Sequence, residues 1–395
     1  MVQCPDRIIA SMDTGVDDAL ALAYLLGSAD ECELSGVIAS YGNKDANTAY
    51  ANTCAVLDLF DRADIPVFLG SEHPSWADAF IPDAGCAQFH GKDGLGNTWL
   101  AGAEALADGA GVSGDDMSED VPDGVVSVGG YLAGDVHAHP ALGSCSRVGR
   151  SRSVGRPQSA TLTALASGGK RRCSVDAADG IEYLIEQVRE FGRDVTVLAT
   201  GPLTDVDAAI TRAPDIASKL RLVMMGGTLT QPGNCWDAVA ETNIIQDPEA
   251  ANRVFHSGAD ITMVGLDVTH QCLLPQSAAD QWRATGTKRG RFLADLADFS
   301  IKANLEADPT LFSGGMPLHD PLAAAVALDS SLVDCFDLAL RAETNTGDFN
   351  GVRGRTTGDP VGLVNHSMPR VHVALGVDAE RFLSRFVERI AEICR

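Results

Sequence analysis

Three carboxylates crowd into six residues near the N-terminus: Asp13, Asp17 and Asp18. The run follows an apolar stretch at 8–10 and precedes a helical pattern at 19–26. Like charges at this spacing repel one another unless a cation neutralises them. Carboxylate oxygens are preferred ligands of Ca²⁺ and Mg²⁺. The run therefore predicts a hard-metal site in a strand-to-helix loop. The alternative for Asp17 and Asp18 is that they only complement the dipole at the start of the helix.

Strand-like apolar runs alternate with helical patterns along the chain, and these elements would position the carboxylates. The expected strands are 8–12, 34–41, 65–69, 195–199, 220–225, 261–266 and 371–375, and the clearest helices are 17–26, 181–191 and 378–394. Continuous apolar strands of this kind predict an α/β fold, with a mainly parallel, Rossmann-like sheet covered by helices on both faces. We expect a single domain over 1–395, with its active site at the C-terminal strand ends.

The composition narrows the class of protein. The chain has 395 residues, 45% of them hydrophobic, which is enough for a large core, and its formal net charge of -24 argues against a nucleic-acid partner. Acidic residues combined with scarce lysine predict a halophilic protein, because salt screens the self-repulsion. The lysines are Lys44, Lys92, Lys170, Lys219, Lys288 and Lys302.

The cysteines and the N-terminus indicate where the protein works. Its 10 cysteines form no CxxC pair, so neither a zinc framework nor a disulfide scaffold is expected. The first residues lack the basic and apolar regions of a signal peptide, and no apolar run is long enough to cross a membrane. These features predict a cytoplasmic protein without a membrane partner.

One segment, 102–174, interrupts the pattern. It is rich in Gly, Ser, Asp and Ala, with acidic residues in its first part and basic residues in its second. Three interpretations stay open: a disordered low-complexity insertion, a functional basic arm, or a stretch translated in the wrong frame.

Several motifs occur in a fixed order, and together they resemble a known family. IIASMDTGVDDALAL, at 8–22, resembles the DTDPGxDDALAL opening of the inosine-uridine-preferring nucleoside hydrolases. The further matches are YGN at 41–43, HGKDGL at 90–95, ATGPLTDVDAA at 199–209, MMGG at 224–227, AETNIIQDPEAA at 240–251, MVGLDVTH at 263–270 and PLHDPLAAA at 317–325. The resemblance covers most of the chain outside 102–174.

The resemblance implies a Ca²⁺ site and a general base. Asp13 matches the base, which is also a metal ligand, and Asp18 matches the bidentate ligand. Asp320 matches the distal metal carboxylate, and Thr200 matches a backbone carbonyl ligand. An all-oxygen set suits Ca²⁺ better than a transition metal.

The resemblance also implies a ribose site. The matching positions are Asp17, Asn43, Asn234, Glu241 and Asn243. Because Glu241 and Asn243 alternate along AETN, we expect an extended segment with both side chains on one side. A turn or cap role is the alternative for Asn243.

Three histidines match family positions. His319 would protonate the leaving base, as its ordinary pKa allows, unless it is merely structural. His90 is expected on a loop near the base, with an ordinary loop histidine as the alternative, and His270 carries no assigned role.

Two residues depart from the family pattern. Ser11 and Thr14 stand where the family usually has Asp and Pro. We expect Ser11 to weaken support for the metal site and Thr14 to loosen the loop.

The predicted reaction is Ca²⁺-dependent hydrolysis of a ribonucleoside to ribose and a free base. By analogy with the family we expect a homodimer or homotetramer. Two alternatives remain: a nucleoside- or ribose-binding protein whose catalysis has lapsed, and a metal-dependent phosphohydrolase.

Overall fold

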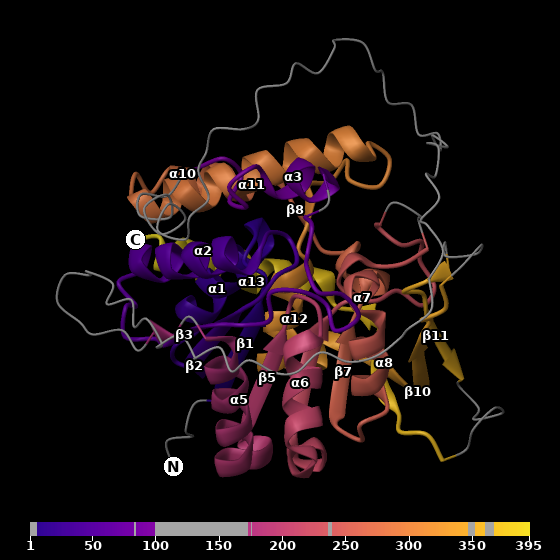
Figure 1. Cartoon of the computed structure of the whole chain (residues 1–395). Helices are drawn as coiled ribbons and strands as arrows, with labels where there is room; N and C mark the ends of the chain where they lie inside the picture. Colours follow the sequence, from indigo (N-terminus) through magenta and orange to yellow (C-terminus); the bar gives the residue numbers. More distant parts are fainter. Residues whose placement is uncertain are drawn as a thin grey trace.

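A ten-stranded sheet forms the centre of the computed structural model (Figure 1), which describes residues 6–82, 84–98, 173–174, 176–235, 239–346, 352–359 and 367–395. The strand order is β11-β10-β12-β7-β6-β5-β1-β2-β3-β4. The strands are β1 (Asp6–Met12), β2 (Cys32–Ala39), β3 (Val67–Leu69), β4 (Cys173–Ser174), β5 (Val195–Ala199), β6 (Arg221–Met225), β7 (Asp260–Val264), β10 (Val333–Ala342), β11 (Thr356–Asp359) and β12 (Val371–Val377). A separate two-stranded sheet joins β8 (Leu273–Leu274) to β9 (Met316–Pro317).

The large sheet is mainly parallel, as predicted. Every adjacent pair from β12 to β4 is parallel, and only β10 runs antiparallel to its neighbours β11 and β12. The carboxyl ends of the parallel strands therefore meet at one edge of the sheet.

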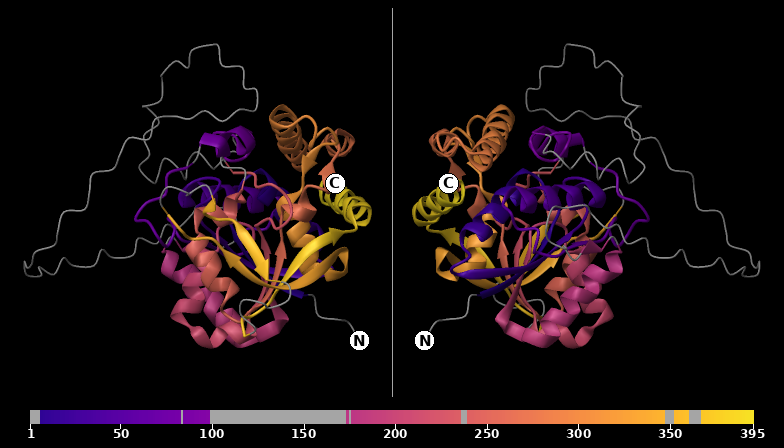
Figure 2. Two further views of the ribbon diagram at one scale, coloured as in Figure 1. Left: turned by 90° about the vertical axis from the view of Figure 1, so that its right-hand side faces the viewer. Right: turned by 90° about the vertical axis from the view of Figure 1, so that its left-hand side faces the viewer.

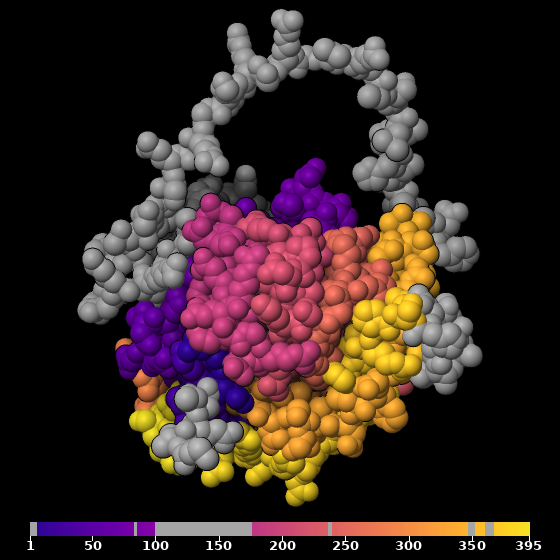
Figure 3. All heavy atoms as spheres, turned by 90° about the horizontal axis from the view of Figure 1, so that it is seen from below, coloured from indigo at the N-terminus to yellow at the C-terminus, as the bar shows by residue number. Residues whose placement is uncertain are grey.

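Helices cover both faces of the sheet, which makes three layers (Figure 2). The helices are α1 (Val16–Gly27), α2 (Ala46–Leu59), α3 (Ala84–His90), α5 (Ala177–Phe191), α6 (Thr204–Arg212), α7 (Thr242–Gln246), α8 (Pro248–Phe255), α9 (Leu266–Thr269), α10 (Gln276–Arg283), α11 (Lys288–Ala307), α12 (His319–Leu328) and α13 (Ala379–Ile393). One core cluster contains side chains from α1, α2, α10, α11, α12 and α13. The other contains side chains from α5, α6 and α8. From below, α5 and α6 form the magenta surface in the centre of Figure 3.

The apolar faces of the helices explain this layering. α13 buries Phe382, Phe386 and Ile390 completely, and the ring of Phe386 lies 5.6 Å from that of Tyr24 in α1. α1 itself is buried along nearly its whole length, because it packs between the sheet and the helices α12 and α13. Its position is therefore fixed on every side.

The segment that the sequence set apart falls largely outside the described residues. Residues 102–172 are not described, whereas Cys173–Ser174 form β4 and pair with Val67 and Phe68 at the edge of the sheet. In the described part of the chain, no helix is both long and apolar enough to span a membrane.

Candidate active site

An acidic cluster lies where the sequence predicted one. Carboxylate oxygens of Asp17, Asp18 and Asp320 all lie within 4.8 Å of one another. Asp17 and Asp18 stand in the first turn of α1, and Asp320 stands in the first turn of α12. Residues some 300 positions apart thus converge at the carboxyl end of the sheet, because both helices begin there.

Asp13 lies beside this cluster, at the end of β1, and is fully buried. Its Oδ2 accepts a hydrogen bond from the backbone N–H of Asn43 at 2.7 Å, and its Oδ1 has no partner among the described residues. Two glycines enclose the carboxylate: a Cβ on Gly42 would lie 1.9 Å from Oδ2, and a Cβ on Gly201 would lie 3.1 Å from Cγ. Neither glycine has a role that the sequence predicted. Gly42 is the middle residue of the YGN match at 41–43. Its close approach to the Asp13 carboxylate, however, is evident only from the three-dimensional structure.

Burial and mutual repulsion perturb these acids. Burial, reinforced by the charge of Asp18, raises the pKa of Asp13 well above its ordinary value. Burial, reinforced by the charge of Asp17, raises the pKa of Asp18 to about 6. Burial and the three neighbouring carboxylates raise the pKa of Asp320 well above its usual range. A cation would relieve this repulsion, and the Oδ1 atoms of Asp13 and Asp17, both buried without hydrogen-bond partners, suit cation ligation.

Thr200 connects the acidic cluster to the opposite side of the site. Its hydroxyl donates to Asp18 Oδ1 at 2.7 Å, and its carbonyl accepts from Asn243 Nδ2 at 2.8 Å. Asn43 also reaches the cluster, because its Nδ2 donates to Asp18 Oδ2 at 3.3 Å. The structure therefore brings these predicted site residues together.

The expectation of an extended AETN segment was wrong. Glu241 instead caps the short helix α7: its carboxylate accepts from the backbone N–H groups of Asn243 at 2.9 Å and Ile244 at 3.1 Å. These two bonds satisfy donors of the first helical turn, and the same carboxylate also accepts from the N–H of the distant Gly227 at 2.9 Å. Asn234 holds the same helix, since its Oδ1 accepts from the N–H of Thr242 at 3.0 Å.

His90, at the end of α3, contacts the start of α1. Its Nδ1 accepts from the N–H of Val16 at 3.2 Å and lies 3.8 Å from Asp17 Oδ1. Burial lowers the pKa of His90 to about 4. The ring is therefore a neutral acceptor at this contact.

His319 and His270 stack edge to face, with ring centroids 5.6 Å apart. His319 Nδ1 lies 2.8 Å from the hydroxyl of Thr269. Burial lowers the pKa of His319 well below its ordinary value, and the nearby His270 and His90 add smaller effects in the same direction. The role predicted for His319 assumed an ordinary histidine pKa, whereas burial disfavours the protonated ring.

The two departures from the family pattern have partners of their own. Ser11 Oγ donates to the buried carboxylate of Asp205 at 3.3 Å. The hydroxyl of Thr14 lies 2.6 Å from that of Thr53 in α2. Thr14 therefore ties the acidic loop to α2 by a side-chain hydrogen bond, which a proline could not make.

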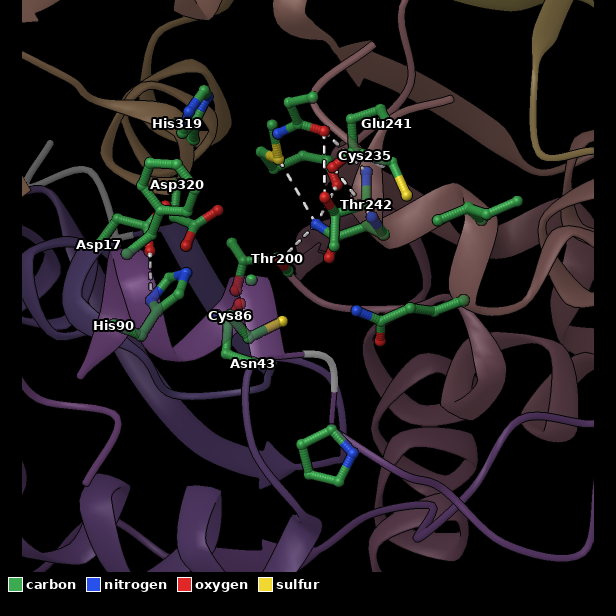
Figure 4. A pocket seen from close by; sticks show the side chains of 18 of the residues that line it. Asp17, Asn43, Cys86, His90, Thr200, Cys235, Glu241, Thr242, His319 and Asp320 are labelled. Atoms are coloured by element: carbon green, nitrogen blue, oxygen red, sulfur yellow. Dashed lines mark hydrogen bonds and ion pairs between the residues drawn. The ribbon is translucent and has the colours of Figure 1, made fainter. Parts of the chain in front are cut away.

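Several of the site residues line a cavity of about 850 Å³. Figure 4 shows Asp17, His90, His319 and Asp320 on one side, Glu241, Cys235 and Thr242 on the other, and Thr200 and Asn43 between them. Asp17, Glu241 and Asp320 line the cavity, whereas Asp13 and Asp18 are not among its lining residues. The cavity also has an apolar wall that includes Trp76, Phe80 and Ile81, for which the sequence analysis gave no signal.

Comparison with known proteins identifies the chain. The family model described as inosine-uridine preferring nucleoside hydrolase matches residues 8–384. The chain belongs to this family. The predicted family, the predicted fold and the prediction of a hydrolase that acts on N-glycosyl bonds are thereby confirmed.

Individual relatives differ in the bases that their names give. The chain is 30% identical to the pyrimidine-specific ribonucleoside hydrolase RihA of Enterobacter sp. (strain 638), over 98% of this chain and 97% of the relative. It is 33% identical to the purine-preferring ribonucleoside hydrolase from Gardnerella vaginalis, with a TM-score of 0.74 over 98% of this chain and 99% of that one. It is 27% identical to the plant nucleoside hydrolase PpNRh1, with a TM-score of 0.72 over 98% and 99% of the two chains.

Proposed function

We propose that this nucleoside hydrolase cleaves ribonucleosides to ribose and a free nucleobase with the help of one Ca²⁺. The observation that carries the proposal is the buried cluster of Asp17, Asp18 and Asp320 at one side of a cavity large enough for a nucleoside. The available donors are carboxylate and carbonyl oxygens, which are the ligands that Ca²⁺ prefers. We propose Asp13, Asp18, Asp320 and the carbonyl of Thr200 as its ligands. When bound, the ion supplies positive charge that offsets the carboxylates and promotes ionisation of water.

The chain's own residues would bind the sugar and move the protons. Asp17, Asn43, Asn234, Glu241 and Asn243 provide acceptors and donors for ribose hydroxyls. Asp13 takes a proton from the attacking water, whose oxygen bonds to C1′ while the C1′–N bond breaks.

The electron pair of that bond leaves with the base, whose nitrogen must then be protonated. His319 can pass its N–H proton to this nitrogen while its other ring nitrogen takes up a proton through solvent, and His90 lines the same cavity. Asp13 releases to solvent the proton that it took from the water, and solvent returns one proton to His319, so water and nucleoside give ribose and the free base with both side chains restored.

The lining of the cavity argues against a phosphohydrolase. No residue of this lining, as far as the structure describes it, is a lysine or an arginine, whereas Asp17, Glu241 and Asp320 are acidic. Apart from the proposed ion, the described lining therefore offers a phosphate group no cationic side chain. The alternative of a lapsed binding protein depends on turnover and is decided by assay.

The assay measures release of reducing sugar from inosine and from uridine, with and without Ca²⁺. We expect turnover in Ca²⁺, none after treatment with a chelator, and a loss of about 100-fold or more in Asp13→Ala. Phe336→Ala, on the exposed part of β10, is the control and should keep wild-type turnover. Nucleoside binding without turnover would indicate the lapsed enzyme, and phosphate release from a nucleotide would indicate the phosphohydrolase.

We also propose that the protein works in the cytoplasm as a homodimer or homotetramer and at high salt. The net charge of -24 and the scarcity of lysine support the salt requirement. Light scattering and thermal unfolding across a salt series measure both properties. A monomer at every salt level contradicts the assembly, and a melting temperature indifferent to salt contradicts the halophilic character.

A further inference from the structure

The buried hydroxyl of Thr269 contacts one ring nitrogen of His319. Thr269 is the last residue of α9 and is fully buried, and its Oγ1 lies 2.8 Å from His319 Nδ1. Among the described residues, Nδ1 is the only side-chain partner of this hydroxyl. A hydroxyl carries one hydrogen, and a buried donor is normally paired. The hydroxyl therefore donates to Nδ1, which then carries no hydrogen of its own, and the ring hydrogen lies on Nε2.

Hydrogen bonds hold both sides of this contact in place. α9 is anchored because the carboxylate of Asp267 accepts from the backbone N–H groups of Leu229 at 2.8 Å and Thr230 at 2.7 Å. The start of α12 is anchored beside it, because the N–H of Leu318 donates to the carbonyl of Cys272 at 2.9 Å. The hydroxyl and the ring therefore meet from two fixed backbones, and their contact orients the ring.

The other ring nitrogen is open to the cavity. His319 lines the cavity, and its Nε2 makes no hydrogen bond to any described residue. Nε2 is also not one of the described side-chain atoms that are buried without a partner, so it is accessible rather than enclosed. The ring stands beside Asp320 on the side of the cavity that holds the acidic cluster (Figure 4). A ligand in the cavity can therefore reach Nε2.

The hydrogen on Nε2 is the one that the reaction requires, and this step rests on the proposed function. The leaving nitrogen of the base needs a proton from the cavity side of the ring, and Nε2–H supplies it. In the other tautomer a lone pair of Nε2 would face the base, and the N–H would point at Thr269. We propose that Thr269 is a positioning residue, whose hydroxyl holds His319 in the tautomer and orientation that direct an N–H toward the leaving base.

The hydroxyl also suits the ring after proton transfer. Once Nε2 has given its proton to the base and Nδ1 has taken one up, Nδ1 becomes a donor. The hydroxyl of Thr269 then turns and accepts from Nδ1, since a hydroxyl both donates and accepts. No bond within Thr269 forms or breaks, so its effect is confined to the ring.

The first test measures the tautomer directly. ¹⁵N NMR of Ca²⁺-loaded enzyme, labelled in its histidine rings, distinguishes a protonated ring nitrogen from a bare one, and His319→Asn identifies the signals of this ring. We expect Nε2 protonated and Nδ1 bare in the wild type and in Thr269→Ser. In Thr269→Val no hydroxyl hydrogen needs an acceptor, so the ratio of Nε2–H to Nδ1–H should fall about fivefold or more. A wild-type ring with its hydrogen on Nδ1 overturns the proposal, whatever the enzyme cleaves.

The second test separates a positioning residue from a structural one. It measures kcat and KM for the better substrate of inosine and uridine, whose base leaves with a proton, and for 4-nitrophenyl β-D-ribofuranoside, whose nitrophenolate leaves without one. Thr269→Val should lower kcat for the nucleoside about tenfold or more and change KM by less than about threefold, since a positioned general acid contributes about 100-fold or more. Its kcat for the nitrophenyl riboside should stay within about threefold of the wild type.

Two variants serve as controls. Thr269→Ser keeps the hydroxyl and should restore nucleoside turnover. Thr196→Val is the matched control, because Thr196 is a buried threonine of β5 that does not line the cavity, and it should leave kcat for both substrates unchanged.

The outcomes separate this assignment from the proposed function. If the wild type cleaves neither substrate, the proposed function itself fails. If it cleaves both and Thr269→Val slows them equally, Thr269 is structural. If Thr269→Val keeps the nucleoside kcat within about threefold of the wild type, the hydroxyl does not direct the proton. Either of the last two results overturns the assignment and leaves the proposed function standing.

Discussion

Gly42→Ala tests whether the position of the Asp13 carboxylate controls the reaction. The added Cβ would lie 1.9 Å from Asp13 Oδ2 and 2.6 Å from its Cγ, whereas real Cβ contacts essentially never fall below 3.0 Å. The carboxylate must therefore retreat by about 1 Å. This retreat breaks its 2.7 Å hydrogen bond from the N–H of Asn43. A displacement of that size in a catalytic group costs on the order of 100-fold in rate.

A graded series strengthens this test. Gly201→Ala places its Cβ 3.1 Å from the Cγ of Asp13, so a shift of a few tenths of an ångström relieves this close contact. We therefore expect kcat/KM to fall by about tenfold or less. Gly258→Ala is the matched control: its φ is also positive, but no atom lies within 4 Å of the new Cβ. That control costs about 1 kcal/mol of backbone strain and leaves the active site untouched.

The assay is kcat/KM at saturating Ca²⁺, with the melting temperature measured in parallel. We expect kcat/KM to be lowest for Gly42→Ala and intermediate for Gly201→Ala. Gly258→Ala should have the kcat/KM of the wild type. If Gly42→Ala keeps kcat/KM within threefold of wild type while folded, the enclosed position of Asp13 does not matter and the reasoning is refuted.

Three further predictions concern stability and metal binding. Asp247→Asn should destabilise the fold by about 1–3 kcal/mol in urea unfolding, because either orientation of the amide sets an NH₂ group against the backbone N–H of Ser75 or of Ala250; an unchanged midpoint contradicts this. Phe386→Ala should cost about 3–5 kcal/mol in the same assay, since the ring is fully buried, and a loss below 1 kcal/mol would disprove its role in the core. Ca²⁺ at 100 times its Kd should stabilise the wild type by about 2.7 kcal/mol and Asp320→Asn by much less; equal thermal shifts would remove Asp320 from the ligand set.

The central sheet was predictable because its strands are buried on both faces. β5 occupies the predicted residues, Val195–Ala199, and all five are buried, so its sequence is apolar except for Thr196. β10 gave no such signal, since residues 334–337 are exposed and break the apolar pattern. It was recognisable only through its pairing with β12.

The site was predictable where a residue's role follows from its type and its neighbours along the chain. The spacing of Asp17 and Asp18 predicted an acidic cluster, and the match to the family at PLHDP predicted that Asp320 joins it. The conformation around Glu241 was not predictable, because its carboxylate also accepts from the N–H of Gly227, 14 residues away in sequence, and that tertiary contact favours a cap over an extended strand. The apolar wall around Trp76 was not predictable either, because tertiary contacts determine which side chains of a loop face the cavity. One such contact is the hydrogen bond from the Trp76 indole to the carbonyl of Gln246.

The burial of α1 has a consequence for the choice of ion. Asp18, a proposed ligand, occupies the first turn of a helix that is buried along nearly its whole length, so the backbone that carries this carboxylate cannot shift to suit a larger or a smaller cation. A rigid oxygen cage of this kind ranks divalent ions by ionic radius. Affinities measured across Mg²⁺, Ca²⁺, Sr²⁺ and Ba²⁺ should therefore pass through a sharp maximum rather than vary gradually.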